Sequence, residues 1–140
     1  WRRLISLASG ITPNAFELGI LTGRSVDTMD DVFAAADSLL GGRTNWVAAT
    51  SAAPAQWRPG EMSTALRTAD SKQVIWHRWV DSAVKGTGDT FSATTTANLL
   101  SGVPLEDSIT RAGEVVTRAL EGTVAAGVNE LLLRARLLRL

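Results

Sequence analysis

The run from Trp46 to Ala49 constrains the fold more than any other feature of this sequence. Its four residues are all apolar, and the polar residues Thr50 and Ser51 follow at once. An unbroken apolar run of this kind is typical of a strand that is buried on both faces. Helices usually cover such a strand on both sides, and a chain of 140 residues with 45% hydrophobic composition is large enough to build that core.

Helical patterns precede this strand. Gly10-Ile11-Thr12-Pro13 fits the end of a short buried strand, and Asn14 then stands where a helix N-cap is expected. Glu17 follows three residues later, and Gly23 is well placed to end the helix. A second helix, with an acidic first turn, is predicted over 30–40 and should end at the glycine pair that follows.

The remaining segments complete an α/β pattern. Residues 51–60 contain two prolines and a glycine and are predicted to form a loop. Met62–Thr68 and Gln73–Val80 are predicted to form a β-hairpin with a turn at Asp70-Ser71. Two helices follow: one begins at the Gly86–Asp89 segment, has its apolar part over 91–100 and ends at Ser101-Gly102, and the other begins at Pro104. The predicted inner face of the last helix consists of Leu105, Ile109, Ala112, Val116, Ala119 and Thr123.

The composition narrows the classes of function. The chain has no cysteine, which removes disulfides, thiolate nucleophiles and cysteine-based metal sites. Lysine plus arginine and aspartate plus glutamate number 14 each, so the net charge indicates no nucleic-acid partner. No apolar run reaches the roughly 18 residues that a membrane-spanning helix needs. The single histidine, His77, lacks nearby co-ligands and is interpreted as a structural or surface residue.

The segment from Lys85 to Ala93 carries the stronger chemical signal. Gly86 and Gly88 let the backbone approach a ligand closely, and the following helix offers free N–H groups and the positive end of its dipole. Asp89 stands in the first turn, where a carboxylate can accept a proton from a substrate hydroxyl. By itself the segment fits a turn with an aspartate cap equally well, and it is not a Walker sequence.

The segment from Ile11 to Glu17 has two interpretations as well. In the simpler one, Asn14 and Glu17 form a capping box and satisfy each other's backbone donors. In the functional one, Glu17 holds a hydrated Mg²⁺, an ion that keeps several waters and takes one or two carboxylates. Considered alone, this segment favours the capping box.

Taken together and in this order, the two segments resemble the ribokinase superfamily, and within it the pyridoxine/pyridoxal/pyridoxamine kinases. The residues that carry the resemblance are Gly10–Leu18, Ile20–Gly23, Ala36–Leu40, Thr50–Ala52, Thr68–Asp70, Lys85–Phe91, Arg111–Gly113 and Asn129–Leu131. The resemblance implies a ribokinase-like α/β layered fold, with a mostly parallel central sheet flanked by helices and a β-hairpin. Residues 1–140 would form its C-terminal, ATP-binding part.

The resemblance also implies an activity. This is ATP-dependent phosphorylation of the 5′-hydroxymethyl group of pyridoxal, pyridoxine or pyridoxamine, which makes pyridoxal 5′-phosphate or a close analogue. It implies Mg²⁺ as cofactor, with a monovalent cation such as K⁺ as a further candidate. The expected protein is a cytoplasmic homodimer that acts on a small molecule and binds neither nucleic acid nor membrane.

The family's functional residues fall on particular positions of this sequence. Asp89 matches the catalytic aspartate, and Gly86, Thr87 and Gly88 match the anion hole for the γ-phosphoryl group. A further set lies on the ATP side or near the metal. That set is Thr12, Thr50 and Ser51 for ATP, and Glu17 with its motif partner Asn14 for Mg²⁺ through water.

Two alternatives remain open. The hydroxymethylpyrimidine kinases of the same superfamily share the Thr-Pro-Asn helix start, but they typically carry cysteine where Asp89 stands here. The other alternative is a non-catalytic fragment that needs an N-terminal half, because the family's vitamin pocket lies in that half. The beginning of this chain at Trp1 is consistent with both a fragment and a part of a longer enzyme.

Overall fold

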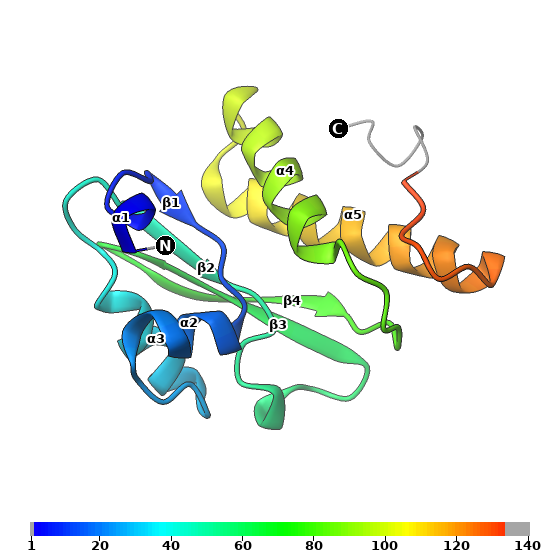
Figure 1. Ribbon diagram of the computed structural model, residues 1–140, viewed down its shortest axis with the longest axis horizontal. Coiled ribbons are helices and arrows are strands. Elements are labelled where there is room, and N and C mark those ends of the chain that lie inside the picture. The colour runs from blue at the N-terminus through cyan, green and yellow to red at the C-terminus, as the bar shows by residue number, and fades with distance from the viewer. Residues whose placement is uncertain (1, 134–140) are drawn as a thin grey trace. The chain divides into compact units, whose positions relative to one another are not determined.

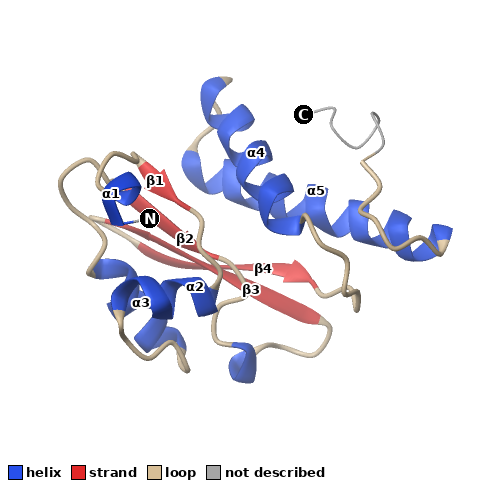
Figure 2. Cartoon of the chain, viewed as in Figure 1, coloured by secondary structure: helices blue, strands red, loops and turns tan. Residues whose placement is uncertain are grey.

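The computed structural model describes residues 2–133 and shows two compact units, the first ending at Trp76 and the second beginning at His77 (Figure 1). The first unit contains α1 (Arg2–Ile5), β1 (Gly10–Ile11), α2 (Ala15–Thr22), α3 (Met29–Asp37), β2 (Trp46–Ala49), the 3₁₀ turn η1 (Pro54–Gln56), β3 (Glu61–Thr68) and most of β4 (Lys72–Arg78). The second contains the end of β4 followed by α4 (Thr87–Leu100) and α5 (Leu105–Ala126). Figure 2 distinguishes the helices from the strands.

The four strands form one sheet in the order β1-β2-β3-β4. β1 pairs with β2 in parallel, and β2 pairs with β3 antiparallel, with Ala49 opposite Ala65. β3 and β4 form the predicted hairpin, whose turn is closed by a 3.0 Å hydrogen bond from the Thr68 amide to the Ser71 carbonyl. The α/β class and the hairpin are therefore confirmed.

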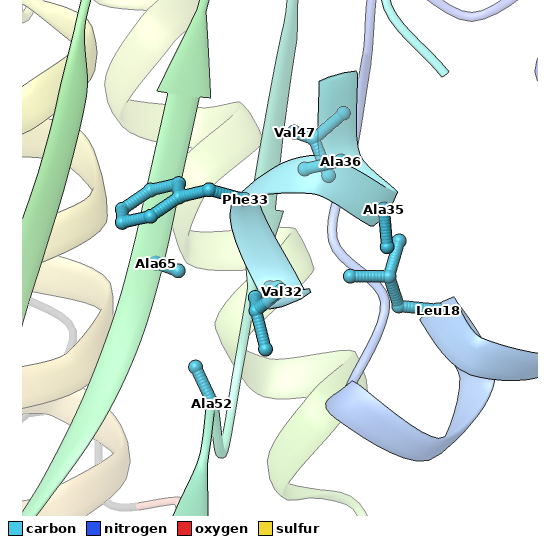
Figure 3. Close-up of a cluster of buried hydrophobic side chains, with 9 residues drawn as sticks. Leu18, Val32, Phe33, Ala35, Ala36, Val47, Ala52 and Ala65 are labelled. Carbon is cyan, nitrogen blue, oxygen red and sulfur yellow. The ribbon is translucent and has the colours of Figure 1, made fainter. Parts of the chain in front are cut away.

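The core of the first unit lies between the sheet and α3. Val47, Ala48 and Ala49 are each 0% exposed, and because successive strand residues point to opposite faces, β2 is buried on both faces as predicted. Figure 3 shows Phe33 directed toward β3 and Val32 toward the chain after β2. The buried cluster consists of Leu18, Val32, Phe33, Ala35, Ala36, Val47, Ala49, Ala52 and Ala65.

Two predicted boundaries were wrong. α3 ends at Asp37, before the glycine pair, because the Ser38 hydroxyl donates to the Ala35 carbonyl at 2.7 Å and the next amides bond three residues back. β4 ends at Arg78 rather than Val80, and Trp79 is 43% exposed beyond it.

In the second unit, α4 and α5 pack against each other. The predicted inner face of α5 was partly wrong, because Ser108 and Val115 are buried whereas Leu105 and Val116 are half-buried. Ser108 tolerates burial because its hydroxyl donates to the Val103 carbonyl at 3.2 Å. Among the described residues, no helix combines the length and the apolar character that a membrane crossing requires.

His77 packs against α5, as expected of a structural side chain. A Cβ added to Gly113 would overlap the His77 ring, so the helix approaches the ring closely because this residue is glycine. Burial lowers the pKa of His77, and the carboxylate of Glu114 acts in the opposite direction. The Nε2 atom of His77 has no hydrogen-bond partner within residues 2–133.

Candidate active site

The carboxyl ends of β1 and β2 lie together and gather one group of predicted site residues. The Thr50 amide donates to the Pro13 carbonyl at 2.9 Å, and the Ala15 amide donates to the Thr50 carbonyl at 3.0 Å. These bonds extend the parallel pairing past β2 to a bridge between Asn14 and Thr50. Thr12 therefore stands on one chain of this edge and Thr50 on the other, the edge at which α/β sheets usually bind ligands.

Asn14 and Glu17 form the capping box that the spacing predicted. Asn14 Oδ1 accepts the Glu17 amide at 2.8 Å, and Glu17 Oε2 accepts the Asn14 amide at 2.9 Å. Glu17 is nevertheless exposed, so its carboxylate is accessible from solvent. Within residues 2–133, no cluster of three histidine, aspartate or glutamate side chains is arranged to hold a metal ion. A single exposed carboxylate can bind a Mg²⁺ ion that keeps most of its water ligands, but it cannot supply a full set of protein ligands.

The chain turns sharply after Thr50. Ser51 has a φ of 51° and Ala53 a φ of 42°, both in the left-handed region that favours glycine. Ala52 between them is fully buried, while Thr50 and Ser51 are half-buried. The predicted ATP-side residues thus stand at the beginning of a bend with a defined backbone conformation.

The second group of predicted residues forms the start of α4. Gly86 precedes the helix with a φ of 96°, which a residue with a Cβ rarely adopts. No side chain in the described part of the chain caps this helix. At Gly88, no atom from elsewhere in residues 2–133 lies within 4 Å of the position that a Cβ would take. The space over the first turn is therefore open on the side of Gly88.

Asp89 is exposed in the first turn of α4, beside these glycines. The Thr90 amide and hydroxyl both donate to the Gly86 carbonyl, at 3.0 and 2.9 Å. These two bonds tie the Gly86 carbonyl to the first turn of α4 and so stabilise the backbone at the helix start. An exposed helix start with an adjacent carboxylate can bind an anion and accept a proton from a nearby hydroxyl.

The structure brings the predicted residues together in two groups. Thr12, Asn14, Glu17, Thr50 and Ser51 lie around the carboxyl ends of β1 and β2 in the first unit. Gly86, Thr87, Gly88 and Asp89 lie at the start of α4 in the second. The sequence pattern indicated the segments from which both groups come. The roles of these residues in binding and catalysis remain predictions.

Two residues that support the bend after Thr50 were not predicted from the sequence. Trp57 and Ser63 both donate side-chain hydrogen bonds to the Ala52 carbonyl. Neither residue stands in a recognisable motif, since Trp57 is in a loop of irregular sequence and Ser63 in the middle of a strand. Two consecutive apolar small residues, Ala52 and Ala53, were the one local sign that this part of the loop is buried.

An exposed helix start without a side-chain cap, and a polar edge at the ends of parallel strands in an α/β fold, are features of proteins that handle phosphate groups. Comparison with known proteins places the chain within that class. Residues 1–133 match the phosphomethylpyrimidine kinase family, and the chain belongs to this family.

Particular relatives are similar over nearly the whole chain. A pyridoxine/pyridoxal/pyridoxamine kinase of Bordetella bronchiseptica is 52% identical over 130 residues, which cover 93% of this chain and 46% of the relative. The crystal structure of pyridoxal kinase from Entamoeba histolytica superimposes with a TM-score of 0.80 at 26% identity, over 92% of this chain and 46% of that one. Pyridoxal kinase from Leishmania donovani, in complex with ADP and pyridoxine, gives a TM-score of 0.79 at 25% identity, over 90% and 42% of the two chains. This chain therefore spans about half the length of the relatives that it matches.

Proposed function

We propose that the full-length protein transfers the γ-phosphoryl group of ATP to the 5′-hydroxymethyl group of a B6 vitamer: pyridoxal, pyridoxine or pyridoxamine. The observation that carries the proposal is the exposed, uncapped start of α4 with Asp89 in its first turn. The kinase from Bordetella bronchiseptica, at 52% identity, supports the choice of substrate, and the Leishmania donovani complex supports ADP as the nucleotide product. Residues 1–140 would supply the C-terminal, ATP-binding part of a single kinase domain.

The proposed reaction is an in-line transfer between two oxygens. Asp89 accepts the proton of the vitamer hydroxyl as its oxygen attacks the γ-phosphorus of ATP, and the bond from that phosphorus to the bridging oxygen of ADP breaks. The backbone amides of Gly86, Thr87 and Gly88 bind the negative charge on the equatorial oxygens of the transferring group. Because Gly88 has no Cβ, these oxygens can approach the backbone closely.

The residues at the ends of β1 and β2 would bind the rest of the nucleotide. Thr12, Thr50 and Ser51 are proposed to donate hydroxyl hydrogen bonds to ATP phosphates. Glu17, with Asn14 beside it, would hold Mg²⁺ through water, and the ion would neutralise phosphate charge when bound. A monovalent cation such as K⁺, a cytoplasmic location and a homodimeric assembly complete the proposal.

A second acceptor has a specific observation in its favour. The family that matches residues 1–133 is described as phosphomethylpyrimidine kinase. Hydroxymethylpyrimidine is also a heteroaromatic ring with a primary alcohol, so the same transfer chemistry applies to it. The relative at 52% identity makes the B6 vitamer the first choice.

The acceptor can be tested directly with purified full-length protein. ATP consumption would be measured with pyridoxal, pyridoxine, pyridoxamine, hydroxymethylpyrimidine and ribose as acceptors, each over a range of concentrations. We expect the highest kcat/KM for a B6 vitamer and no turnover of ribose. A higher kcat/KM for hydroxymethylpyrimidine would favour the second acceptor, and turnover of none of them would contradict the kinase assignment.

A further inference from the structure

The bend that follows β2 is held in an unusual conformation by side chains from outside it. Ser51 and Ala53, on either side of Ala52, both have positive φ although neither is glycine. Such residues cost free energy and persist where the surrounding structure leaves them no alternative. Because the bend directly follows Thr50, whatever holds it also sets the direction of the chain at the predicted ATP side.

Ala52 is the point at which the bend is held. Its carbonyl oxygen accepts Trp57 Nε1–H at 2.7 Å and the Ser63 hydroxyl at 2.8 Å, and its amide donates to the Ser63 carbonyl at 3.0 Å. Both lone pairs of the carbonyl are thus engaged. The Ala52 methyl group lies in the buried cluster, near Val32 in Figure 3. Ala52 is therefore fixed at its amide, its carbonyl and its side chain.

The pairing with β3 shows how the bend displaces Ser51. Ala49 lies opposite Ala65, so a regular antiparallel ladder would place Ser51 opposite Ser63 two residues later. Instead, the amide that bonds to Ser63 belongs to Ala52. One extra residue therefore stands on the β2 side at this point, as in a β-bulge, and Ser51 lies outside the register of the ladder. Bulges next to functional sites commonly redirect a side chain in this way.

We propose that Trp57 and Ser63 are positioning residues for nucleotide binding. By holding the Ala52 carbonyl, they stabilise the left-handed bend that presents the hydroxyls of Thr50 and Ser51 to ATP phosphates. This inference rests on the proposed function, since it takes the ends of β1 and β2 to be the ATP side. It adds two residues that do not touch the nucleotide but determine the geometry of those that do.

The first test removes each donor separately. Trp57→Phe keeps an aromatic ring without its N–H, and Ser63→Ala removes the hydroxyl at a buried position. In the full-length protein we expect each change to raise the Kd for ADP, measured by calorimetry, about fivefold, as the loss of one ordinary hydrogen bond would. The double variant should lose more, and the KM for pyridoxal should not change.

The matched control is Trp76→Phe. It makes the same chemical change on β4, where the Trp76 ring lies 4.2 Å from the Arg58 guanidinium and takes no part in the bonds to Ala52. We expect this variant to bind ADP as the wild type does. An equal rise in Kd in the control would show that the effect comes from general loss of stability and would overturn the inference.

A rescue variant separates positioning from a purely structural role. Glycine adopts the left-handed conformation without penalty, so Ala53→Gly should restore most of the ADP affinity when added to the double variant. A lower Tm with unchanged ADP affinity, or the absence of rescue, would overturn the inference. ADP binding does not depend on the acceptor. Failure to phosphorylate any B6 vitamer, with the ADP effects intact, would therefore count against the proposed reaction and not against the positioning role.

Discussion

The starts of α2 and α4 differ in whether side chains accept hydrogen bonds from their backbone N–H groups. At α2, Asn14 and Glu17 satisfy each other's amides, and α3 repeats this arrangement with Thr28 and Asp31. At α4, Gly86 has no side chain to offer, and no other side chain within residues 2–133 caps the helix. Helix starts leave N–H groups that need partners. In α2 and α3 side chains of the protein accept some of these amides, whereas at α4 none of the described side chains does, and we propose that a phosphate group binds there.

The start of α5 shows that a missing cap is not sufficient by itself. α5 also lacks a side-chain cap, but Pro104 precedes it and Glu106 and Asp107 occupy its first turn. Proline has no N–H to satisfy, and two carboxylates already compensate the positive end of the helix dipole. α4 differs because glycines, rather than a pair of acidic side chains, lie over its first amides. We therefore propose the start of α4, and not that of α5, as the helix start that binds an anion.

The substitution Asp89→Asn tests whether the carboxylate at the start of α4 takes part in the reaction, and its expected effect is the largest. In the full-length protein, Asp89→Asn should lower kcat by about 10²–10⁴-fold, because the amide cannot accept the hydroxyl proton. The Kd for ADP, measured by calorimetry, should stay close to that of the wild type. Unchanged turnover would remove Asp89 from its proposed role.

Alanine substitutions at Gly88 and at Gly122 test whether a phosphoryl group occupies the space at the start of α4. Gly88 and Gly122 are both helical, and at neither does an atom from elsewhere in residues 2–133 lie within 4 Å of the position that an added methyl group would take. Alanine at either position should raise the free energy of unfolding by about 0.5–1 kcal/mol. Only Gly88→Ala should lower kcat/KM, by about 10²-fold, because its methyl group displaces the phosphoryl oxygens. Equal activity of the two variants would contradict the proposed anion site.

At α2, two substitutions separate capping from metal binding. Asn14→Ala should cost about 1 kcal/mol of stability, because the Glu17 amide loses its acceptor. Glu17→Gln should preserve stability, since glutamine also completes a capping box. If Glu17 holds Mg²⁺ through water, the glutamine variant should instead need more Mg²⁺ for half-maximal activity. An unchanged Mg²⁺ requirement would leave Glu17 with a capping role alone.

The smallest expected effect is a pH dependence of stability that comes from His77, a residue at neither of these helix starts. Because burial lowers the pKa of His77 below its ordinary value of 6.5, the unfolded chain takes up the proton first as pH falls. His77 should therefore leave the free energy of unfolding unchanged above pH 6.5 and should lower it progressively as the pH falls below 6.5. Thermal unfolding of the wild type and of His77→Gln between pH 5 and 8 measures this. A constant Tm difference between them over the whole range would contradict it.

Much of the local structure could be predicted from the sequence. The capping box of α2, its end at Gly23, the doubly buried β2 and the hairpin all depend on neighbouring residues or on simple periodicity. The position of Asp89 in the first turn of a helix followed from the glycines before it. Errors had two causes. Helical spacing alone did not indicate that packing buries Val115 rather than Val116. A local hydrogen bond from the Ser38 hydroxyl to the Ala35 carbonyl ends α3 before the glycine pair, and the sequence pattern did not indicate it.

Residues close along the chain specify most of the helices and strands and mark the two segments with the proposed chemistry, because capping, turns and strand burial depend on neighbouring residues. Tertiary structure alone decided that Thr50 pairs with Asn14, and that Trp57 and Ser63 meet at one carbonyl to hold a left-handed bend. These contacts join residues from separate segments, and no local propensity specifies them. Their geometry follows from the packing of β2, β3 and α3 around a shared core.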